Sequence, residues 1–600
     1  MSGELLHRGP DDSGVFVDRH VGFCFRRLAI IDLAQGNQPF YNADGSIVLI
    51  CNGEIYNYKE LRCRLISKGY AFKTNCDVEV LVYLYEEYGT EFLNMLNGQF
   101  AFAIYDKNKD RLFLARDHVG IAPLFYSLKE DVFLFGSEIK ALLQHPSIKR
   151  RVNLRGLDQM ISFPGLSSPT TMFEEVHSLM AGHYLLLEEG RVRVHEYWDL
   201  DYPQEKDEIR DQDEGELIEE MDEVLTQAVR YRLNADVPVG IYLSGGLDSS
   251  LIGALVHQLS PDNRRNSFSV TFDDPRINER KYQQIMSDRL GSLHKEYLFS
   301  NEDIAGRLRA AVFYAESPLK ETYNTCSLAL SELVKQNNLK VILTGEGADE
   351  LFGGYVGYKF DQWSGCRGDA GNGYETAMEE DMCMKLWGDA GFKYEKKYFE
   401  FNELKSALYS DALNQALPEF NSVREGIVKK CRLAGRSYLH KRSYVDFKLR
   451  ISDHLVADHG DRVAYANSVE ARYPFLDINF INFARNMHPG FKLKGLTEKY
   501  ILKKYAARYV PADIINREKF SFVAPGSQYL LSKNIGWVND ILSEETIKRQ
   551  GYFNYKTVER LKKAYLSEDF SLNQTFETDF LMILITFGIF LEVFDIPDLN

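Results

Sequence analysis

The sequence predicts two folded domains: an α+β domain, followed by an α/β domain whose C-terminal part is mainly helical. Three observations lead to this prediction. Short β-rich runs separated by turn residues dominate the first 200 of the 600 residues. Strand patterns alternate with helical patterns between 237 and 345, and the chain beyond 355 has mainly helical patterns. Strands alternating with helices are typical of a parallel sheet.

The first domain, predicted to span 1–200, combines short strands with two helices. Apolar residues recur at helical spacing over 77–88, and a second helix is expected over 57–68. A β-hairpin is predicted over 183–198, with Glu189-Gly190 at its turn. The other strand patterns cover 21–32, 46–53, 100–106, 111–117 and 132–140.

An acidic, polar stretch at 201–215 predicts a linker, and the second domain is predicted to span 216–600. This domain begins with a helix that runs to about residue 233. An apolar run at 580–591 is shorter than the ~20 residues that a membrane helix needs, so it predicts a buried helix. The remaining strands are expected at 237–244, 266–272 and 339–345, and the helices from 249, over 279–290 and over 325–335.

The composition is that of an acidic protein. Lys and Arg number 71 against 87 Asp and Glu, a net charge of −16, which argues against nucleic acid as a partner. Eight cysteines without C-x-x-C spacing favour free thiols in a reducing compartment. The chain turns polar and charged from its first residues, so no signal peptide is expected. We therefore expect a cytoplasmic enzyme that acts on small molecules, without a membrane partner.

The segment SGGLDSS at 244–250 follows a strand pattern and opens a helix. Its glycines let the backbone approach a ligand closely, and N–H groups at a helix N-terminus bind anions. Asp248 can bind Mg²⁺ beside phosphates. The segment lacks the G-K-[ST] of a Walker A loop, and a plain glycine turn is the alternative. It looks like the PP-loop of ATP pyrophosphatases, which split ATP into AMP and pyrophosphate.

A second loop, TGEGADELFGGY at 344–355, follows the third strand of the second domain. It places Glu346, Asp349 and Glu350 at the carboxyl end of a parallel strand, where ligands bind in open α/β sheets. Their mutual repulsion indicates a cation or a proton-transfer role. Helix capping, the alternative, would explain one of the three. Lys499 lies in a helical pattern, where a solvated charge is the ordinary interpretation.

Together, these motifs resemble those of glutamine-dependent asparagine synthetases of the bacterial B type. The resemblance covers nearly the whole chain, and its N-terminal part is similar to a class II glutaminase domain. It implies an N-terminal-nucleophile glutaminase sandwich followed by an α/β PP-loop ATP pyrophosphatase domain with a helical C-terminal part. The N-terminal motifs are HRGPDDSG, RRLAIIDLAQGNQPF, NGEIYNYKELR, DVEVLVYLYEEYG, LNGQFAFAIYD and ARDHVGIAPLFY. The C-terminal motifs are SGGLDSS, SFSVTF, LTGEGADELFGGY, GDRVAYANSVEARYPFLD, LTEKYILKKYA and REKFSF.

The resemblance implies that one site releases ammonia from glutamine and that a tunnel joins it to a second site. There ATP adenylates the side-chain carboxyl of aspartate, and ammonia displaces AMP. Asn52 and the Gly53 N–H are implied as the oxyanion hole. The implied glutamine-binding residues are Arg27, Asn52, Gly53, Glu54 and Asp77.

For the second site, the resemblance implies ATP and Mg²⁺ as cofactors, with Asp248 and Asp349 on the metal. Glu346 is implied as the base for the incoming ammonia, and Lys499 as the cation that stabilises negative charge on the phosphates. The resemblance also implies a homodimer, the common oligomeric state of the family. The implied nucleotide-binding residues are Leu243, Val270, Thr344 and Gly345 around the nucleotide, and Ser244, Gly246, Asp248 and Ser249 at the pyrophosphate.

The glutaminase motifs depart from the family in one respect. The family nucleophile is an N-terminal cysteine whose own amino group can act as base, whereas this sequence begins Met1-Ser2-Gly3. One explanation is a truncated chain or a late start, which the retained glutamine-binding residues favour. The other is a natural variant that uses free ammonia or another amine, as β-lactam synthetases lack the cysteine. We expect amide formation from ammonium salts but not from glutamine.

The segment 316–326, which bears on the choice of acceptor, is a second departure from the family. The segment 316–326 does not repeat the arginine-containing segment of some aspartate-using members, although a carboxylate substrate favours such a partner. Aspartate is the expected acceptor, and another carboxylate, from secondary metabolism or polysaccharide modification, is the alternative. A β-lactam-synthetase-like cyclase and a non-catalytic scaffold compete with these functions. The intact glutamine-site residues disfavour the cyclase, and the retained Asp248, Asp349, Glu346 and Lys499 disfavour the scaffold.

Overall fold

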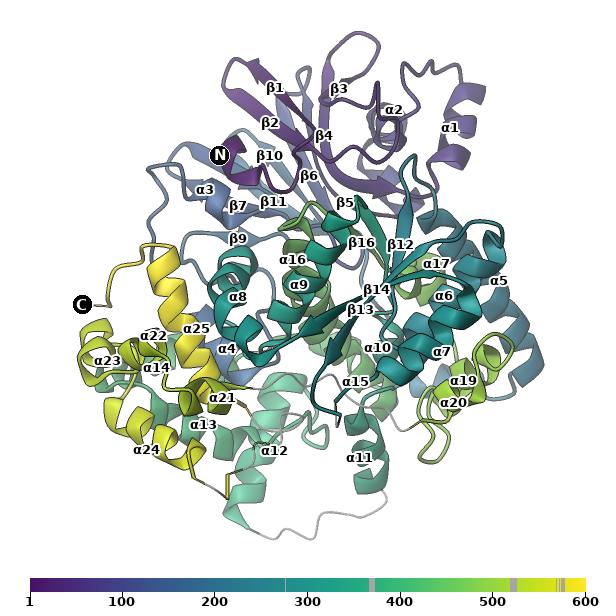
Figure 1. Cartoon of the computed structure of the whole chain (residues 1–600). Helices are drawn as coiled ribbons and strands as arrows, with labels where there is room; N and C mark the ends of the chain where they lie inside the picture. Colours follow the sequence, from purple (N-terminus) through teal and green to yellow (C-terminus); the bar gives the residue numbers. More distant parts are fainter. Residues whose placement is uncertain are drawn as a thin grey trace.

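A computed structural model of the chain describes residues 1–275, 277–365, 373–517, 526–567, 569–570, 572 and 578–599 (Figure 1). Of the motif REKFSF, Arg517 is described and 518–522 lie outside the described residues. The N-terminal sheets lie at the top of Figure 1, the parallel sheet at its centre, and the last helices at the lower left.

The N-terminal part contains three antiparallel sheets, with strand orders β1-β2, β11-β10-β6-β5-β4-β3 and β8-β7-β9. Its helices are α1 (Tyr58–Ser67), α2 (Val80–Tyr88), α3 (Ile139–Leu142) and α4 (Leu154–Ser162). Its strands are β1 (Asp12–Asp18), β2 (Val21–Arg27), β3 (Phe40–Tyr41), β4 (Ile47–Ile55), β5 (Gly98–Asp106), β6 (Arg111–Arg116), β7 (Phe125–Lys129), β8 (Val132–Gly136), β9 (His177–Ser178), β10 (His183–Glu188) and β11 (Arg191–Glu196).

The six-stranded sheet is the middle layer of this part. Alternate residues of a strand point to opposite faces, and here both faces are buried. Leu49 and Phe102 pack in one cluster with Leu81 of helix α2. Val48 and its neighbours on the other face pack in a second cluster with Phe16 of β1. Because both faces are covered, residues 100–105 of β5 form a continuous buried apolar run, with no polar alternation.

The C-terminal part is built on a five-stranded parallel sheet of order β14-β13-β12-β15-β16. Its strands are β12 (Val239–Tyr242), β13 (Asn266–Phe272), β14 (Leu293–Phe299), β15 (Val341–Leu343) and β16 (Glu470–Arg472). The chain runs outward from β12 to β14 and then returns to the other side of β12 with β15. The loops after β12 and β15 therefore diverge at a topological switch point, where open α/β sheets bind ligands.

The helices of the C-terminal part cover this sheet and also form the region below it in Figure 1. Helix α25 is buried from Leu581 to Leu591 and is apolar on all sides over this stretch except for Thr586, as expected for a helix surrounded by others. The helices that flank the sheet are α5 (Glu214–Arg232), α6 (Leu247–Leu259), α7 (Arg280–Leu290), α8 (Asn301–Ala315), α9 (Tyr323–Gln336), α10 (Ala348–Phe352), α16 (Arg462–Tyr465), α17 (Ile478–Arg485), α18 (Pro489–Lys492), α19 (Tyr500–Ala506) and α20 (Ala512–Ile515). The others are α11 (Val356–Gly365), α12 (Tyr374–Trp387), α13 (Tyr398–Leu408), α14 (Asp411–Phe420), α15 (Tyr438–Asp446), α21 (Ser527–Ser532), α22 (Gly536–Ile541), α23 (Glu544–Gln550), α24 (Tyr555–Tyr565) and α25 (Phe580–Val593), with a π-helix at Phe447–Leu455.

The structure confirms the parallel sheet, the hairpin β10–β11, the buried helix α25 and helices α1, α2, α7 and α9. Several predicted strands are too long: β12 and β15 are shorter at both ends than predicted, β2 ends at Arg27, and β8 ends at Gly136. The segment after β8 turns into helix α3 because the carboxylate of Glu316, from the other part of the chain, accepts hydrogen bonds from the backbone N–H groups of Ile139 and Lys140. Within the described residues, no helix is long and apolar enough to cross a membrane.

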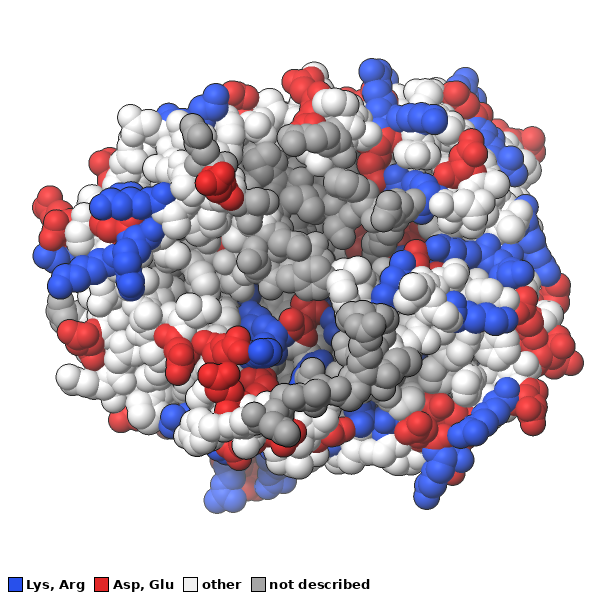
Figure 2. Space-filling model, turned by 90° about the horizontal axis from the view of Figure 1, so that it is seen from below, with Lys and Arg blue, Asp and Glu red and all other residues white. Residues whose placement is uncertain are grey.

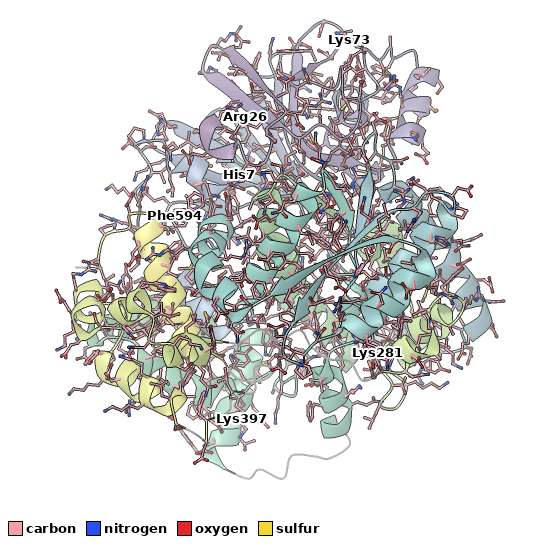
Figure 3. All side chains as sticks on the ribbon, viewed as in Figure 1. His7, Arg26, Lys73, Lys281, Lys397 and Phe594 are labelled. Atoms are coloured by element: carbon pink, nitrogen blue, oxygen red, sulfur yellow. The ribbon has the colours of Figure 1, made fainter. Side chains whose placement is uncertain are left out.

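A buried network of charged groups connects the two parts of the chain. Arg8 donates to Asp461 at 2.7 Å and to Glu138 at 3.1 Å. Glu138 also contacts His7 at 3.0 Å and Lys140 at 2.6 Å. Figure 3 labels His7 at the junction between the N-terminal sheets and the C-terminal part. Because breaking a buried pair leaves an uncompensated charge, such pairs define the relative position of the two parts.

Two candidate active sites

The larger of the two candidate sites is a cavity of about 630 Å³ at the carboxyl ends of β12, β13 and β15. Figure 2 shows the molecule from below, where basic and acidic side chains meet at a hollow. Every residue predicted for the nucleotide and for amide formation lines this cavity: Leu243, Ser244, Gly246, Asp248, Ser249, Val270, Thr344, Gly345, Glu346, Asp349 and Lys499. The structure therefore brings together residues from four separate segments.

The loop after β12 presents hydroxyl and N–H groups to this cavity. Gly245 adopts a φ of +76°, which L side chains rarely adopt, and Gly246 caps the N-terminus of α6. The hydroxyls of Ser244 and Ser249 lie 2.9 Å apart, and the Gly246 N–H donates to the Ser244 hydroxyl at 3.2 Å. A Cβ at Gly345 would collide with the backbone N of Ser249, so the loops after β12 and β15 touch. The arrangement can hold an anion at the start of α6.

Lys499 joins the two loops electrostatically. Its Nζ lies 2.5 Å from Asp248 Oδ2 and 2.7 Å from Asp349 Oδ1, and the residue is 3% exposed. Burial alone would lower its pKa, but the charges on Asp248 and Asp349 raise that pKa well above its ordinary value. A Cβ at Gly354 would collide with both Asp349 and Lys499, so this close approach requires glycine. Lys499 precedes helix α19, with a φ of +51°; its prediction within a helix was wrong.

Glu346 lines the same cavity from the loop after β15 and is open to the cavity space. The surrounding protein nevertheless desolvates its carboxyl group. Burial, with the charges of Asp248 and Asp349, raises its pKa to about 7. Tyr473, directly after β16, is near enough for the charge on Glu346 to raise its pKa in addition to burial. A carboxyl group with a pKa near neutrality can take up and release a proton.

The sequence motifs did not assign several charged groups that line this cavity. Arg517 lies beside the serine-glycine loop, since its Nη2 would stand 3.6 Å from a Cβ at Gly246. The motif REKFSF was the available signal for this residue. Lys320, Lys396 and Arg450 also line the cavity. Lys320 belongs to the segment 316–326, whose sequence bears on the choice of acceptor, whereas no sequence motif drew attention to Lys396 or Arg450.

The second candidate site is a pocket of about 210 Å³ in the N-terminal part. All five residues predicted to bind glutamine line it: Arg27, Asn52, Gly53, Glu54 and Asp77. Three cysteines, Cys24, Cys51 and Cys76, line it as well. Burial raises the pKa of the Cys51 and Cys76 thiols well above the ordinary value, which keeps these two thiols protonated.

The strand β4 supplies the polar groups at the centre of this pocket. Asn52 Nδ2 is buried and lacks a hydrogen-bond partner among the described residues, so a donor is available for a ligand oxygen. Gly53 adopts a φ of +133°, and a Cβ there would collide with the Gln99 carbonyl oxygen. Arg27 donates to Asn37 Oδ1 at 2.6 Å and to the Asp32 carbonyl at 2.7 Å, which holds its guanidinium in place.

Two neighbouring carboxyl groups make this pocket acidic. Burial and the charge of Asp77 raise the pKa of Glu54 well above its ordinary value, and burial raises the pKa of Asp77 to about 6. Arg472, which is fully buried, lies 3.2 Å from Glu54 Oε1 and 2.7 Å from Glu470 Oε1. A residue of the C-terminal sheet thus compensates a charge in the N-terminal pocket.

Strand β16 lies between the two sites. Glu470, its first residue, lines the smaller pocket, whereas Ala471 and the following Tyr473 line the larger cavity. Gln99 of β5 donates to the Ala471 carbonyl at 3.3 Å, so this strand also contacts the N-terminal sheet. The sites are separated by the thickness of a single strand at this point.

The fold and these two sites define a two-domain protein of mixed α/β content. A model of the glutamine amidotransferase domain matches residues 1–198, and a model of asparagine synthase matches residues 220–586. Asparagine synthetase [glutamine-hydrolyzing] 1 of Bacillus subtilis is 32% identical, over 91% of this chain and 86% of that protein. The chain belongs to the asparagine synthase family and is an enzyme of this type, a ligase with a glutamine amidotransferase domain.

Two further relatives show the range of names in this family. Amidase chry2 of Gibberella zeae is 30% identical, over 92% of this chain and 89% of that protein. Asparagine synthetase B [glutamine-hydrolyzing] of Escherichia coli is 30% identical, over 87% of this chain and 78% of that protein. Family membership therefore supports amidation. Because the relatives include both amidases and asparagine synthetases, their names do not identify the acceptor of this chain.

Proposed function

We propose that this protein is an ATP-dependent ligase that amidates the side-chain carboxyl group of aspartate with ammonia derived from glutamine. The observation that carries the proposal is the contact of Lys499 with Asp248 and Asp349 beside the serine-glycine loop, at the switch point of the parallel sheet. This arrangement supports a PP-loop ATP pyrophosphatase fold. The layered sheets of the first domain support an N-terminal-nucleophile glutaminase sandwich.

In the first proposed step, an acceptor carboxylate oxygen attacks the α-phosphorus of ATP. The bond between the α- and β-phosphates breaks, pyrophosphate leaves, and β-aspartyl-AMP forms. Ser244, Gly246 and Ser249 hold the pyrophosphate, and Lys499 balances the charge that develops on it. Leu243, Val270, Thr344 and Gly345 surround the nucleotide in this scheme.

Asp248 and Asp349 fit Mg²⁺ that takes most of its ligands from phosphates and water. Both carboxylates contact one cationic group, Lys499 Nζ, so they also lie close enough to share a metal ion. The described residues contain no cluster of three or more His, Cys, Asp or Glu side chains that could hold a metal ion. Phosphates and water would therefore supply the remaining ligands. Mg²⁺ would neutralise phosphate charge there.

In the second proposed step, ammonia attacks the activated carbonyl carbon, AMP leaves, and Glu346 accepts a proton from the nitrogen. The pKa of Glu346, about 7, suits this role near neutral pH. Ammonia is released from glutamine in the N-terminal pocket, where Asn52 and the Gly53 N–H stabilise the oxyanion. It then passes strand β16 to reach the activated carbonyl carbon in the larger cavity. Arg27, Glu54 and Asp77 hold the glutamine substrate.

The proposed function predicts that aspartate, Mg·ATP and an ammonium salt together give equal amounts of AMP, pyrophosphate and asparagine. Chromatography of the nucleotides and of the amino acids measures all three products. Omitting aspartate is the control and should abolish pyrophosphate release. A scaffold would release no pyrophosphate, and a cyclase would release it without consuming ammonia; either result would contradict the proposal.

A protein with this sequence and nothing added is expected to use ammonium salts but not glutamine. Position 2 is serine, and the Cys51 and Cys76 thiols of the glutamine pocket are held protonated, so they are poor nucleophiles. Asparagine formation with either nitrogen source, and glutamate release from glutamine, provide the measurement. Glutamine-dependent turnover at a rate similar to that with ammonium would show that another group of this chain acts as nucleophile.

Amidation of a different carboxylate is the second candidate function. The segment 316–326 contains no arginine, unlike that of some aspartate-using members. A relative of this chain is named as an amidase, which supports the same alternative. Pyrophosphate release over a panel of carboxylic acids separates the two candidates, because aspartate must be the best substrate for the first to hold.

A further inference from the structure

A cavity of about 190 Å³ lies between the N-terminal and the C-terminal part, and it shares no described lining residue with the two candidate active sites. We infer that this cavity binds a small uncharged polyol, such as a neutral monosaccharide. The inference goes beyond the proposed function and does not depend on it. Asn94 and Asn479 are exposed, whereas Asn97 and His118 are buried, so the cavity reaches inward from the surface. A buried water molecule needs only about 10–15 Å³ of such space, so a small organic molecule has room.

Both parts of the chain contribute walls to this cavity. In the N-terminal part, Asn97 precedes β5, His118 follows β6 and Trp198 follows β11. In the C-terminal part, Asn479 and Asn482 lie on helix α17. A ligand held between these residues would touch both parts at once, and its binding would stabilise their contact.

The walls of the cavity carry no formal charge. None of the described residues that line it is Lys, Arg, Asp or Glu. Burial lowers the pKa of His118 to about 4, although the charge of nearby Asp477 opposes this effect, so the imidazole is neutral near pH 7. Asp477 itself is paired with Arg232, whose Nη1 lies 2.7 Å from Asp477 Oδ2. A charged ligand would be left without a counter-ion, which is costly, so an uncharged ligand is favoured.

Asn97 provides an unused hydrogen-bond acceptor at this cavity. Its Nδ2 donates to Asp477 Oδ2 at 2.9 Å, and the orientation of the amide is defined because a carboxylate can only accept. Asn97 Oδ1 is buried and lacks a hydrogen-bond partner among the described residues, and an O–H group of a ligand would supply one. The neutral His118 ring has one donor and one acceptor nitrogen, and the amides of Asn479 and Asn482 each offer both kinds of group. Hydroxyl groups match these walls because each can donate and accept through one oxygen atom.

An apolar wall completes the cavity and favours a ring-shaped polyol over a cluster of water molecules. Trp198, Met95, Leu96 and Ile478 line the cavity together with the asparagines. The Trp198 ring packs edge-on against His118, with ring centroids 5.5 Å apart. The C–H groups of a sugar ring can pack against such a wall while its hydroxyl groups reach the amides. Apolar walls with a few polar groups are typical of ligand pockets.

Isothermal titration calorimetry with glucose, galactose, mannose and myo-inositol tests the inference. Calorimetry reports binding itself, whereas polyols also stabilise proteins non-specifically through exclusion from the protein surface. At least one of the four should bind with a dissociation constant on the order of 1 mM, as expected for a ligand of about twelve non-hydrogen atoms. Glucuronate, which is charged, and cyclohexanol, which has one hydroxyl group, should bind at least about 10-fold more weakly.

Variants of helix α17 test whether the polyol occupies this cavity. Asn479→Ala and Asn482→Ala should each weaken polyol binding about 2- to 10-fold, the loss expected for one neutral hydrogen bond. Asn486→Ala is the matched control, because Asn486 directly follows the helix, is exposed and does not line the cavity. Its affinity should equal that of the unchanged protein. The thermal unfolding midpoint without ligand shows whether each variant retains the fold.

The inference fails if none of the four polyols binds at concentrations up to about 20 mM, well above the expected dissociation constant. It also fails if cyclohexanol or glucuronate binds as tightly as the polyols, since the cavity would then select an apolar or a charged ligand. Affinity should be the same at pH 6 and pH 8, because His118 is neutral at both, and a difference would contradict the uncharged walls. Polyol binding that survives both Asn479→Ala and Asn482→Ala, or that Asn486→Ala weakens equally, would place the polyol elsewhere on the protein. Because the titration needs neither ATP nor ammonia, failure of the proposed function would leave its outcome unchanged.

Discussion

Replacing Lys499 with methionine is expected to lower the rate of pyrophosphate release about 10³-fold, the upper loss observed when one transition-state donor is removed. Lys499 Nζ contacts Asp248 at 2.5 Å and Asp349 at 2.7 Å, and the residue is 3% exposed. Its ammonium group thus has a defined position before substrate binds. Methionine is an unbranched side chain one atom shorter than lysine, and it cannot balance the negative charge that develops on the leaving pyrophosphate.

The measurement is steady-state pyrophosphate release with acceptor, Mg·ATP and ammonium at saturation. Lys504→Met is the control, because Lys504 lies on helix α19, is exposed and does not line the cavity. Lys499→Arg retains the charge and should recover part of the rate, which distinguishes a charge requirement from loss of folding. A Lys499→Met enzyme with more than a tenth of the original rate would exclude the proposed role.

Replacing Glu346 with glutamine is expected to lower amide formation about 10²- to 10³-fold and to remove a pH dependence near neutrality. A base must be deprotonated to act, and the pKa of Glu346 is raised to about 7. With a pKa of 7, about a tenth of the protein is active at pH 6 and about nine tenths at pH 8. The rate should therefore rise with pH through 7 in the unchanged protein, and the glutamine variant should lack this rise.

The rate of amide formation is measured between pH 6 and pH 8.5 at a constant concentration of free ammonia, so that the ionisation of ammonium does not contribute. Glu350→Gln is the informative control. The pKa of Glu350 is also raised to about 7, by burial and by Asp349, but this side chain does not line the cavity. That variant should retain the rise near pH 7. Loss of the rise in Glu350→Gln and its persistence in Glu346→Gln would assign the titration to Glu350.

The loops that carry the chemistry could be predicted from the sequence because each is local. A strand, a glycine-containing turn and a helix follow one another within about ten residues, as at 239–250. The torsion angles there depend on the residue types themselves, and Gly245 with its positive φ is an example. The parallel sheet followed from the same local alternation of strands and helices.

The residues predicted for ATP binding and amide formation line one cavity, and those predicted for glutamine binding line another. The predicted roles of these residues and the predicted domain boundaries stay predictions. Strand β16 is three residues long and pairs with β15, more than a hundred residues earlier in the chain. No periodicity can be read from three residues, so the sequence offered no sign of it.

The sequence by itself determined the family, the two-domain order and the loops that follow β12 and β15. Only the tertiary structure decided where the isolated charges lie. Lys499 is an unremarkable lysine in the sequence, yet contacts with Asp248 and Asp349 from two other segments raise its pKa. Lys320 and Lys396 meet in one cavity through long-range packing. Local torsional preferences are encoded residue by residue, whereas the electrostatic environment of a side chain depends on groups that only folding brings near it.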